Sequence, residues 1–298
     1  MSTVDVSAVV VTFNSMPWVE RCLESLRPYE TVVVDHGSTD GTLELVRRRY
    51  PQARLIEQEN RGLAAGWNTG IRTAAGRYLL IINADAWTLD DAVPQLAEFA
   101  DAHPEAAVVA PKLLNTDGTL QRSVRGFPTL WRLATEYFFL RKLAPRSRLL
   151  NAFYAGGFDH ESVREAEFVM GSCMLVRREA VDSVGLLDEA FFLFSEETDW
   201  CYRFRAAGWK VLFYPGAEVV HVGGASHGGR MFKENVRGHL RFLAKHRGRR
   251  EAERARRLML WSLRLRGLVF RGERGRMYRD VASWLGSGPV SSLLEAPR

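Results

Sequence analysis

Residues 78–85, which read YLLIINAD, decide the fold. The stretch opens with an apolar run typical of a buried strand and ends in Asn83, Ala84 and Asp85. A carboxylate at the carboxyl end of such a strand lies in the crevice where open α/β sheets bind ligands. An oxygen-rich side chain and an aspartate on either side of a small residue also suit a hard divalent cation that takes its other ligands from water and phosphates. We therefore expect a metal and diphosphate site here.

The segments before this stretch repeat a strand, a turn and a helix. Val6 to Phe13, Thr31 to Val34 and Ala53 to Glu57 are apolar runs, and each is followed by a helical pattern. The alternation continues through residue 111, which predicts βαβ units and a nucleotide-binding layer. Further strands are expected at 168–177, 208–214 and 217–222. The fold class is α/β, with a Rossmann-like, mostly parallel central sheet flanked by helices.

Length and pattern divide the chain into a sheet domain and a helical extension. The 298 residues, 46% hydrophobic and 26% charged, are ordinary for a globular protein with a sizeable core. We expect a domain at 1–229, with a nucleotide-binding half at 1–111 and an acceptor-binding half at 112–229 that contains short helices. Residues 230–298 are predicted to form a basic, amphipathic, helical C-terminal extension.

The chain carries few signals for export or covalent cross-linking. No apolar run reaches the roughly 18 residues of a membrane-spanning helix, and the opening residues MSTVDVSAVVVTFN lack a signal-peptide pattern. Cys22, Cys173 and Cys201 are widely spaced, which favours reduced packing residues over disulfides or a zinc site. The sequence therefore predicts a cytoplasmic protein.

Positive charge is concentrated near the C-terminus. Residues 230–279 contain 17 Arg and Lys against 4 Asp and Glu, a net charge of +13, whereas residues 1–229 have a net charge of −6. Within 253–271, Trp261 and several leucines share one helical face and arginines another. This pattern is typical of a helix that contacts a membrane surface, here the inner face of the cell membrane. The alternative is a helix packed on the domain or a homodimer interface. No nucleic-acid partner is expected, because no recognition motif accompanies the charge.

Several further polar residues stand at strand ends or helix starts. Asp35 follows a buried strand and is suited to a base NH or a ribose hydroxyl, although a turn that caps the next helix is the simpler interpretation. Residues 59–70 enter a helix rich in small residues, where exposed amides favour anions. His221 ends a strand before the glycine-rich loop 223–229, which would close over a diphosphate. It is either a packed residue or a nitrogen ligand of a metal such as Mn²⁺.

An acidic cluster begins a later helix. Glu196, Glu197 and Asp199 follow the aromatic stretch AFFLF. Acidic residues at a helix N-terminus commonly compensate the helix dipole. The competing interpretation is a general base beside an apolar wall, because burial raises the proton affinity of a carboxylate.

Four blocks of the sequence together resemble a known family. They are VVVTFN with VVVDHGSTDGT, ENRGLAAGWNTGI, LLIINAD, and the segment from FVMGSCMLVRREAVDSVGLLDEAFFLFSEETDWCYRFR through VVHVGGAS. In this order they are similar to the inverting family 2 glycosyltransferases of GT-A fold, and within them to the bacterial rhamnosyltransferase-like group. The resemblance spans residues 6 to 246.

The resemblance implies roles for individual residues. Asp85 corresponds to the last aspartate of a DxD-type metal motif, and His221 to the histidine that completes the metal site for Mg²⁺ or Mn²⁺. Glu197 corresponds to the catalytic base, with Glu196 and Asp199 as alternatives. The donor-binding residues implied are Thr12, Asn14, Asp35, Asn60, Gly62, Asn68, Asn83, Ala84 and Asp85.

Three positions depart from the family pattern. Asn83 stands where Asp is frequent, which leaves Asp85 as the only carboxylate of this motif. Glu197 stands where Asp is usual, so its carboxylate reaches about one methylene further. His36 replaces the common Asn or Asp after Asp35, which bears on the choice of base.

The resemblance implies a metal-dependent inverting glycosyltransferase of cell-envelope polysaccharide or glycoconjugate synthesis. The expected donor is dTDP-rhamnose, with UDP-hexoses as the alternative, and the expected acceptor is a saccharide or a lipid-linked saccharide. A nucleotidyltransferase would need a glycine- and lysine-rich phosphate loop that VVVTFNSMPW does not provide. A non-catalytic nucleotide-sugar-binding protein would be expected to lose Asp85 or Glu197, and both are present.

Overall fold

The computed structural model describes residues 5–223 and 229–295, which fall into two compact units. The first unit contains the described residues up to Val124 together with Asp159–Phe192 and Glu196–Gly223. The second contains Arg125–Phe158, Leu193–Ser195 and the described residues from 229 onward. The structure thus groups 125–158 with the C-terminal helices, whereas the sequence analysis assigned this segment to the N-terminal domain. Residues 224–228, most of the predicted diphosphate loop, lie outside the described residues.

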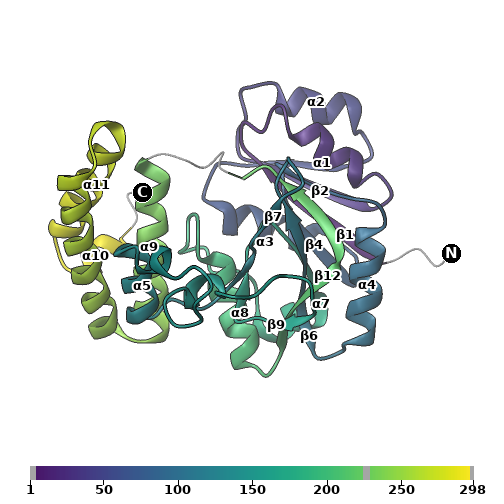
Figure 1. Ribbon diagram of the computed structural model, residues 1–298. Helices are drawn as coiled ribbons and strands as arrows, with labels where there is room; N and C mark the ends of the chain where they lie inside the picture. Colours follow the sequence, from purple (N-terminus) through teal and green to yellow (C-terminus); the bar gives the residue numbers. More distant parts are fainter. Residues whose placement is uncertain (1–4, 224–228, 296–298) are drawn as a thin grey trace. The chain divides into compact units, whose positions relative to one another are not determined.

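One large sheet forms the centre of the first unit (Figure 1). Its strand order in the described residues is β3-β2-β1-β4-β11-β6-β12-β5, with β7 on β6 and β9 on β12. The strands are β1 (Val6–Thr12), β2 (Glu30–Asp35), β3 (Arg54–Glu57), β4 (Tyr78–Asn83), β5 (Ala86–Thr88), β6 (Ala106–Leu114), β7 (Leu120–Gln121), β9 (Arg164–Glu165), β11 (Cys173–Arg177) and β12 (Lys210–His221). Two further short strands are β8 (Val124–Arg125) and β10 (Phe168–Val169).

The longest ladders of the sheet are parallel. β1 lies between β2 and β4 in parallel register, and β12 runs parallel to β6. β11 is inserted antiparallel between β4 and β6. Residues 78–82 of β4 are fully buried because helices cover both faces of the sheet. The predicted α/β class with a mostly parallel, helix-flanked sheet is therefore confirmed.

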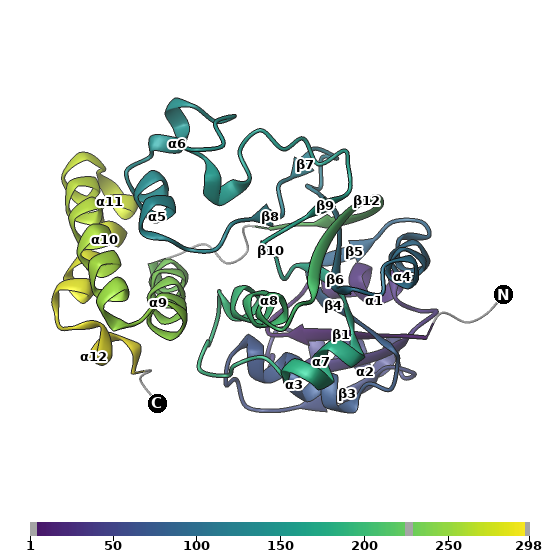
Figure 2. The same cartoon turned by 90° about the horizontal axis from the view of Figure 1, so that it is seen from below.

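Two helical layers enclose the sheet (Figure 2). One face packs against α1 (Val19–Ser25), α2 (Thr42–Arg49) and α4 (Ala92–Ala102). The other face carries α3 (Leu63–Thr73), α7 (Arg178–Val184) and α8 (Glu196–Ala206). Helix α3 approaches β1 closely because two of its residues lack a side chain: a Cβ at Gly66 would lie 2.8 Å from Val11 Cγ2, and one at Gly70 would collide with Val9 Cγ1.

Two strand predictions were wrong in detail. The two strands expected at 208–214 and 217–222 are one strand, β12, because the register against β6 shifts between Tyr214 and Glu218. That irregularity accommodates Pro215, which has no amide hydrogen for the ladder. The single strand expected at 168–177 is interrupted at Gly171 and Ser172, so that β10 and β11 are separate. The short strand β5 was not foreseen.

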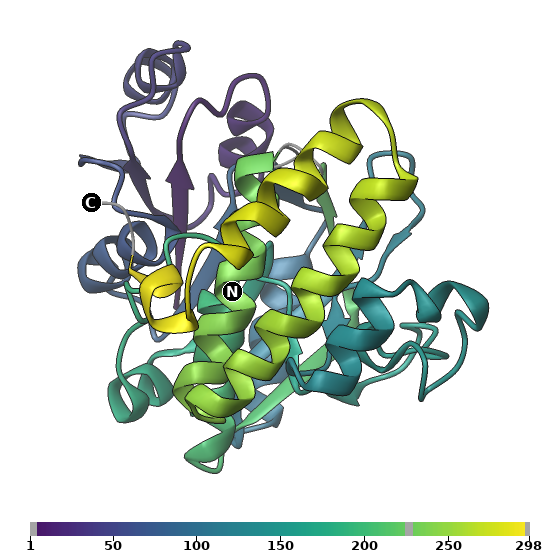
Figure 3. The same ribbon diagram turned by 90° about the vertical axis from the view of Figure 1, so that its left-hand side faces the viewer.

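The second unit is helical, as expected for the C-terminal extension (Figure 3). Helix α10 packs against α9, α11 and α5, and its inner face buries Met259 and Leu263. No helix among the described residues has both the length and the apolar content needed to cross a bilayer. The helices are α5 (Leu130–Tyr137), α6 (Leu140–Leu143), the 3₁₀ turn η1 (Ala152–Tyr154), α9 (Gly229–His246), α10 (Arg249–Val269), α11 (Gly272–Gly286) and α12 (Val290–Leu294).

The central strand provides a test of the fold. Leu80 is fully buried in β4, between β1 and β11. Replacing it with alanine removes buried apolar surface and leaves a cavity, so we expect the L80A variant to lose about 3 kcal/mol of unfolding free energy. Urea denaturation followed by circular dichroism measures this loss. An alanine at exposed Val163 serves as control and should change the value by less than about 0.5 kcal/mol. Equal effects of the two substitutions would contradict the assignment of β4 as the central strand.

Candidate donor and metal site

The carboxyl ends of β1, β2 and β4 meet at one edge of the sheet. In the parallel register, Thr12 pairs with Asp35 and Val11 pairs with Asn83. Pairing between β1 and β2 continues one residue further, because the amide of His36 donates to the carbonyl of Thr12 over 2.9 Å. The structure thus brings together three of the predicted donor-binding residues, Thr12, Asp35 and Asn83.

Asp35 is the hydrogen-bonding centre of this edge. Its side chain has no exposed surface. Oδ1 accepts from the amides of Gly37 (2.9 Å) and Ser38 (2.8 Å), and Oδ2 accepts from the hydroxyls of Thr12 (2.7 Å) and Ser38 (2.6 Å). Four accepted bonds use the capacity of a carboxylate. Asp35 therefore builds the turn after β2, and a donor hydroxyl or base NH would have to share one of these acceptor sites.

The loops after β1 and β2 are fastened to each other by Asn14. Its amide donates to Ser38 Oγ over 2.8 Å, and its Oδ1 accepts from the amide of Thr39 over 2.8 Å. Asn14 has a positive φ of 50°, a conformation that asparagine tolerates better than most residues. The adjacent ring of Phe13 is 54% exposed at the strand end, which gives a planar ligand a surface for stacking. The sequence analysis did not name Phe13 as a binding residue, although an aromatic residue between Thr12 and Asn14 could have indicated a stacking surface.

His36 is packed beneath α3. It is buried, and its Nε2 lies 3.1 Å from Gln58 Nε2. Burial lowers the pKa of His36, which keeps the imidazole neutral at physiological pH. A Cβ at Gly66 would lie 2.7 Å from this Nε2, so only glycine leaves room for the ring. The residue that departs from the family pattern thus fills space between the turn after β2 and α3.

Helix α3 is joined to the segment that precedes α8. Gly62, with a φ of +100°, begins the helix, and a Cβ there would lie 2.5 Å from the carbonyl oxygen of Phe192. Asn68 is buried, accepts from the amide of Leu187 (3.0 Å) and donates to the Leu187 carbonyl (2.9 Å) and Glu189 Oε1 (3.0 Å). These contacts fix the approach to the acidic helix. Donor contacts by Gly62 and Asn68 remain predictions, as do those by Asn60, whose Oδ1 caps the amide of Gly62 over 3.1 Å.

Asp85 and His221 face each other. They are neighbours because β12 pairs antiparallel with β5, with His221 opposite Ala86, and because the amide of Val222 donates to the carbonyl of Asp85 over 3.0 Å. His221 Nε2 lies 3.3 Å from Asp85 Oδ1. The histidine side chain is buried, whereas the aspartate side chain is 21% exposed. Residues 136 positions apart in the sequence thus form one polar pair.

Gln121, on β7, orients this histidine. Its Oε1 lies 2.6 Å from His221 Nδ1, while its Nε2 donates to the His221 carbonyl (3.2 Å) and to Asn115 Oδ1 (2.9 Å). These two donated bonds fix the orientation of the Gln121 amide, so its oxygen accepts a hydrogen bond from the Nδ1–H of His221. In the neutral ring, the Nε2 lone pair then points at the Asp85 carboxylate. Two facing electron pairs repel each other unless a proton on Nε2 or a metal cation lies between them.

The pair fits a divalent cation. Two adjacent ligands of an octahedral ion with metal–ligand distances of 2.0–2.1 Å lie about 2.9 Å apart, close to the observed 3.3 Å. A ring nitrogen held by a second hydrogen bond and a carboxylate oxygen are suitable ligands for Mn²⁺ or Mg²⁺. No group of three or more His, Cys, Asp or Glu residues in the described parts of the chain is arranged to hold a metal. Within the described residues, Asp85 and His221 would supply two ligands, and phosphates and water would supply others.

The three acidic residues at the start of α8 differ in environment. Asp199 has no exposed surface and forms an ion pair with Arg203 (Nε–Oδ2 2.8 Å), whose guanidinium also donates to the carbonyls of Val184 and Leu186. This network anchors the helix. Glu196 is buried as well, whereas Glu197 is partly exposed and its Oε1 accepts from Thr198 Oγ1 over 3.2 Å. Of the three residues, only Glu197 is partly exposed, and its Oε2 has almost no exposed surface.

An apolar wall lies beside Glu197. A Cβ at Gly171 would lie 2.8 Å from Trp67 Cη2 and 3.4 Å from Glu197 Cβ, so Gly171 lies close to both residues. Apolar residues of α3 and of the turn before β11 thus lie on this side of Glu197. The role of general base beside the aromatic stretch AFFLF stays a prediction. Phe194 and Ser195, which directly precede α8, have positive φ values of 67° and 70°, so the chain turns sharply before the helix begins.

Residues 7–185 match the family described as Glycosyl transferase family 2. The chain is 31% identical over 237 residues to the N-acetylglucosaminyl-diphospho-decaprenol L-rhamnosyltransferase of Mycobacterium tuberculosis, a match that covers 72% of this chain and 74% of that protein. It is 29% identical over 233 residues to the succinoglycan biosynthesis protein ExoA of Rhizobium meliloti, with coverage of 71% and 64%.

Solved structures of similar fold include two glycosyltransferase complexes. A mannosyltransferase from Pyrobaculum calidifontis with GDP-Man and Mn²⁺ has a TM-score of 0.54 at 16% identity, over 97% of this chain and 82% of that one. GalNAc-T7 with UDP, GalNAc and Mn²⁺ has a TM-score of 0.56 at 16% identity over 78% of this chain. The chain spans about half of the length of GalNAc-T7, 48%. At this identity the similarity shows the fold alone.

Gln121 provides a test of the metal pair. In the Q121L variant, His221 Nδ1 loses its acceptor, so the tautomer with a free Nε2 is no longer favoured and Mn²⁺ affinity should fall about tenfold. Titration with Mn²⁺ followed by electron paramagnetic resonance measures this affinity without turnover. The Q121E variant keeps an acceptor and should retain binding, and leucine at exposed Gln52 serves as control. Unchanged Mn²⁺ affinity in folded Q121L protein would refute the orienting role of Gln121.

The burial of Glu196 predicts that the stability of the protein depends on pH. Burial, and then the charge of Glu197, raise the pKa of Glu196 above its ordinary 4.5. The folded state therefore binds this proton more tightly than the unfolded chain, and stability is lost as the pH rises from the unfolded towards the folded pKa. Glutamine resembles the protonated acid, so E196Q should gain in melting temperature relative to wild type as the pH increases from about 4 to about 8. Exposed Glu98, changed to glutamine, is the control. A difference independent of pH would contradict this assignment.

Proposed function

The chain belongs to glycosyl transferase family 2, and from this membership we propose that it is a metal-dependent, inverting enzyme that moves a sugar from a nucleoside diphosphate to a hydroxyl. The observation that carries the proposal is the pair of Asp85 and His221 at the sheet edge that also bears Asp35 and Asn83. A sugar nucleotide presents a diphosphate, a ribose and a base. This edge offers two candidate metal ligands, polar side chains at strand ends and the exposed ring of Phe13.

Donor binding would use the fastened loops after β1 and β2. The Phe13 ring gives the base a stacking surface, and such contacts contribute about 1–3 kcal/mol for each base. Thr12, Asn14 and Asp35 hold the two loops in one arrangement before a donor arrives. This preorganisation reduces the entropy lost on binding. Asn83 and Ala84 lead the chain from β4 to Asp85 and would lie next to the diphosphate.

Asp85 and His221 would hold Mg²⁺ or Mn²⁺ together with the donor diphosphate. When bound, the ion neutralises the charge that develops on the leaving diphosphate. The chain's contribution is orientation. Gln121 keeps the His221 Nε2 lone pair available, and pairing between β5 and β12 keeps the carboxylate beside it.

Glu197 would act as the general base. The acceptor hydroxyl gives its proton to the Glu197 carboxylate while its oxygen forms a bond to the anomeric carbon. The bond between that carbon and the diphosphate oxygen breaks on the opposite face, and the diphosphate leaves with the electron pair. One displacement inverts the anomeric centre, through an oxocarbenium-like transition state as in glycoside hydrolysis. Gly171 lies against both Glu197 and the Trp67 ring, so the proposed base has an apolar neighbour on this side.

The similarity to a decaprenol-linked rhamnosyltransferase supports a more specific assignment. We propose dTDP-rhamnose as the donor and a lipid-linked saccharide as the acceptor, within the synthesis of a cell-envelope polysaccharide or glycoconjugate. UDP-hexoses are the competing donors. A screen of dTDP- and UDP-sugars with Mn²⁺ or Mg²⁺, with released nucleoside diphosphate as the readout, tests this. Release that requires dTDP-rhamnose and is abolished by chelator is the expected result, whereas nucleotide binding without release in the presence of lipid extract would indicate a non-catalytic protein.

The two carboxylates make the mechanism testable. The E197Q variant loses the base and should show kcat about 10²- to 10⁴-fold lower, with donor binding retained. The D85N variant loses the metal carboxylate and should be impaired about a hundredfold, with a rise in the Mn²⁺ concentration needed for activity. Glutamine at Glu98, an exposed residue of α4, is the matched control. Near wild-type turnover of folded E197Q would transfer the role of base to Glu196 or Asp199.

A further inference from the structure

One stripe of helix α10 remains exposed along its whole length. The helix has 21 residues and is about 32 Å long. Its inner face is packed against the other helices of the second unit. At spacings of three and four residues, the outer stripe carries exposed side chains. They are Arg250, Arg254, Arg257, Trp261, Arg264, Leu265, Leu268 and Val269.

The C-terminal half of this stripe is apolar. Trp261, Leu265, Leu268 and Val269 are each between 52% and 82% exposed. Single exposed apolar residues are ordinary, but four on one helical face indicate a surface that is covered in use. Folding does not require them, because α10 already buries Met259 and Leu263 on the opposite side.

More apolar surface is exposed on the element next to this half of α10. Ser262 Oγ donates to the carbonyl of Tyr137, and an Arg266 nitrogen donates to the carbonyl of Glu136 over 2.9 Å. The C-terminal end of α5 is therefore packed against α10, and Phe138, the next residue, is 40% exposed. Of the eleven large exposed apolar side chains in the described residues, eight belong to the second unit. They are Trp131, Phe138, Leu143, Leu149, Trp261, Leu265, Leu268 and Val269.

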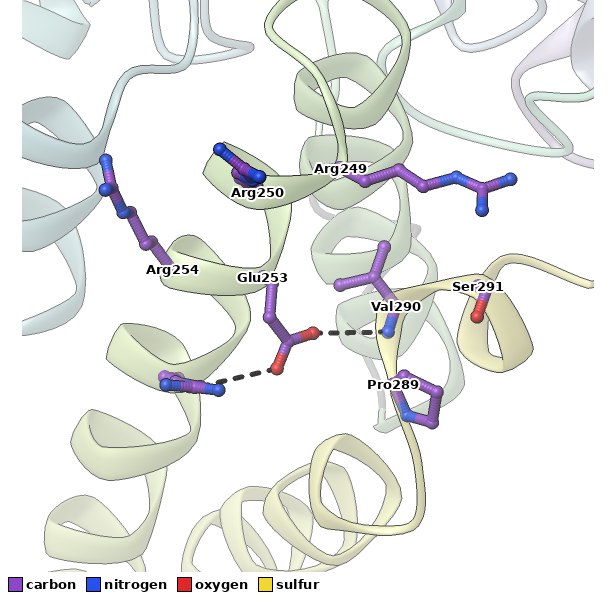
Figure 4. Close-up of a pocket in the computed structure, with 8 residues that line it drawn as sticks. Arg249, Arg250, Glu253, Arg254, Pro289, Val290 and Ser291 are labelled. Atoms are coloured by element: carbon purple, nitrogen blue, oxygen red, sulfur yellow. Dashed lines mark hydrogen bonds and ion pairs between the residues drawn. The ribbon is translucent and has the colours of Figure 1, made fainter.

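The N-terminal half of the stripe is basic and borders a pocket of about 580 Å³ (Figure 4). Arg249, Arg250, Arg254 and Arg257 line it. Figure 4 shows Arg249 and Arg254 extending on either side of Glu253. That carboxylate is already engaged, because it accepts from Arg256 (2.6 Å) and from the amide of Val290 (3.3 Å). Arg254 also pairs with Glu251 (3.5 Å) and Arg257 with Glu253 (3.4 Å), but residues 249–257 carry five arginines against these two glutamates, so positive charge is in excess around the pocket.

Charge complementarity decides the partner. α10 carries seven arginines and two glutamates, and Arg264 lies within the apolar half, with its guanidinium 5.8 Å from the Trp261 ring centroid. An antiparallel homodimer through this stripe would set the basic half of one copy against the apolar half of the other, where the arginines would lose water without gaining partners of opposite charge. An anionic bilayer instead offers phosphates to the guanidinium groups and an apolar interior to tryptophan and leucine. Arginine stems can also lie along the apolar boundary while their charged ends reach the phosphates.

We propose that the exposed stripe of α10 docks on an anionic lipid surface. Trp261, Leu265, Leu268 and Val269 enter the boundary between headgroups and acyl chains, and the arginines around the pocket bind lipid phosphates. The helix then lies in the plane of the surface, which is the arrangement of amphipathic interfacial helices. This inference deepens the proposed function, since a lipid-linked acceptor is found at such a surface, but its evidence lies in the second unit alone.

Vesicle flotation of the full chain tests this docking without any donor or acceptor. The protein should bind vesicles of equimolar phosphatidylcholine and phosphatidylglycerol and should not bind phosphatidylcholine alone, and added salt should weaken binding. An arginine near an anionic surface contributes about fivefold to partitioning, the equivalent of ~1 kcal/mol. The R254Q/R264Q variant should therefore bind about 25-fold more weakly. Serine at Trp261, Leu265 and Leu268 together should weaken binding about tenfold or more.

Matched controls come from the first unit. R48Q/R54Q removes the same charge from exposed positions, and serine at exposed Val163 removes an exposed apolar side chain. Both control proteins should bind vesicles as wild type does. Circular dichroism confirms that each variant is folded.

Other outcomes would overturn the docking. If the control variants weaken binding as much as the α10 variants, net charge rather than this stripe is responsible. If the serine variant converts a dimer into a monomer in light scattering while vesicle binding is unchanged, the stripe is an interface between copies of the chain. Absence of vesicle binding also refutes the proposal. The donor screen is independent: loss of turnover with intact flotation would refute the proposed function and leave the docking valid.

Discussion

The parallel register of β2, β1 and β4 is the constraint on which the first unit depends. It places Thr12 beside Asp35 and Asn83 beside Val11, so that three strand ends carry their polar residues to one edge. A shift of one residue would turn the buried side chains of β4 to the opposite faces, and both helical layers would lose their fit. Burial on both faces therefore fixes the register, and the register in turn fixes the position of the candidate site. Asp85 follows β4 directly and takes its position from it.

Around this edge, the protein uses buried polar groups to hold loops in place. Asp35 accepts four hydrogen bonds, Asn68 makes three, and Asp199 pairs with Arg203. Each of these side chains has its partners inside the protein, which is the condition under which buried polar groups stabilise a fold. Their common effect is to join segments that are distant in sequence. They connect the loops after β1 and β2 to each other, α3 to the segment before α8, and α8 to the turn after α7. Within this otherwise closed network, the Asp85 side chain is 21% exposed and Glu197 is partly exposed.

The second unit follows a different physical plan. Its helices bury one face against each other and place many arginines outside. The apolar side chains that stabilise the unit and the arginines that give it its charge therefore lie on opposite sides of the same helices. α10 shows this most clearly, with Met259 and Leu263 inside and Trp261 and Leu268 outside. One helix thus carries both a packed apolar face and an exposed apolar stripe, because 3.6-residue periodicity lets a single sequence present two distinct apolar faces.

The sequence alone determined the α/β class and the strand ends near Asp35 and Asp85, because each depends on a local pattern of apolar runs and turn residues. It also carried the resemblance to the family, through four blocks of residues in a fixed order. It did not determine that β12 would continue through Pro215 or that Gly171 would interrupt a predicted strand, since both depend on the register of a neighbouring strand. Only the tertiary structure identified Gln121 as the partner of His221 and separated Glu197 from buried Glu196 and ion-paired Asp199. The physical reason is that the tautomer of a histidine and the accessibility of a carboxylate are set by atoms from remote segments, which leave no signal in the residues beside them.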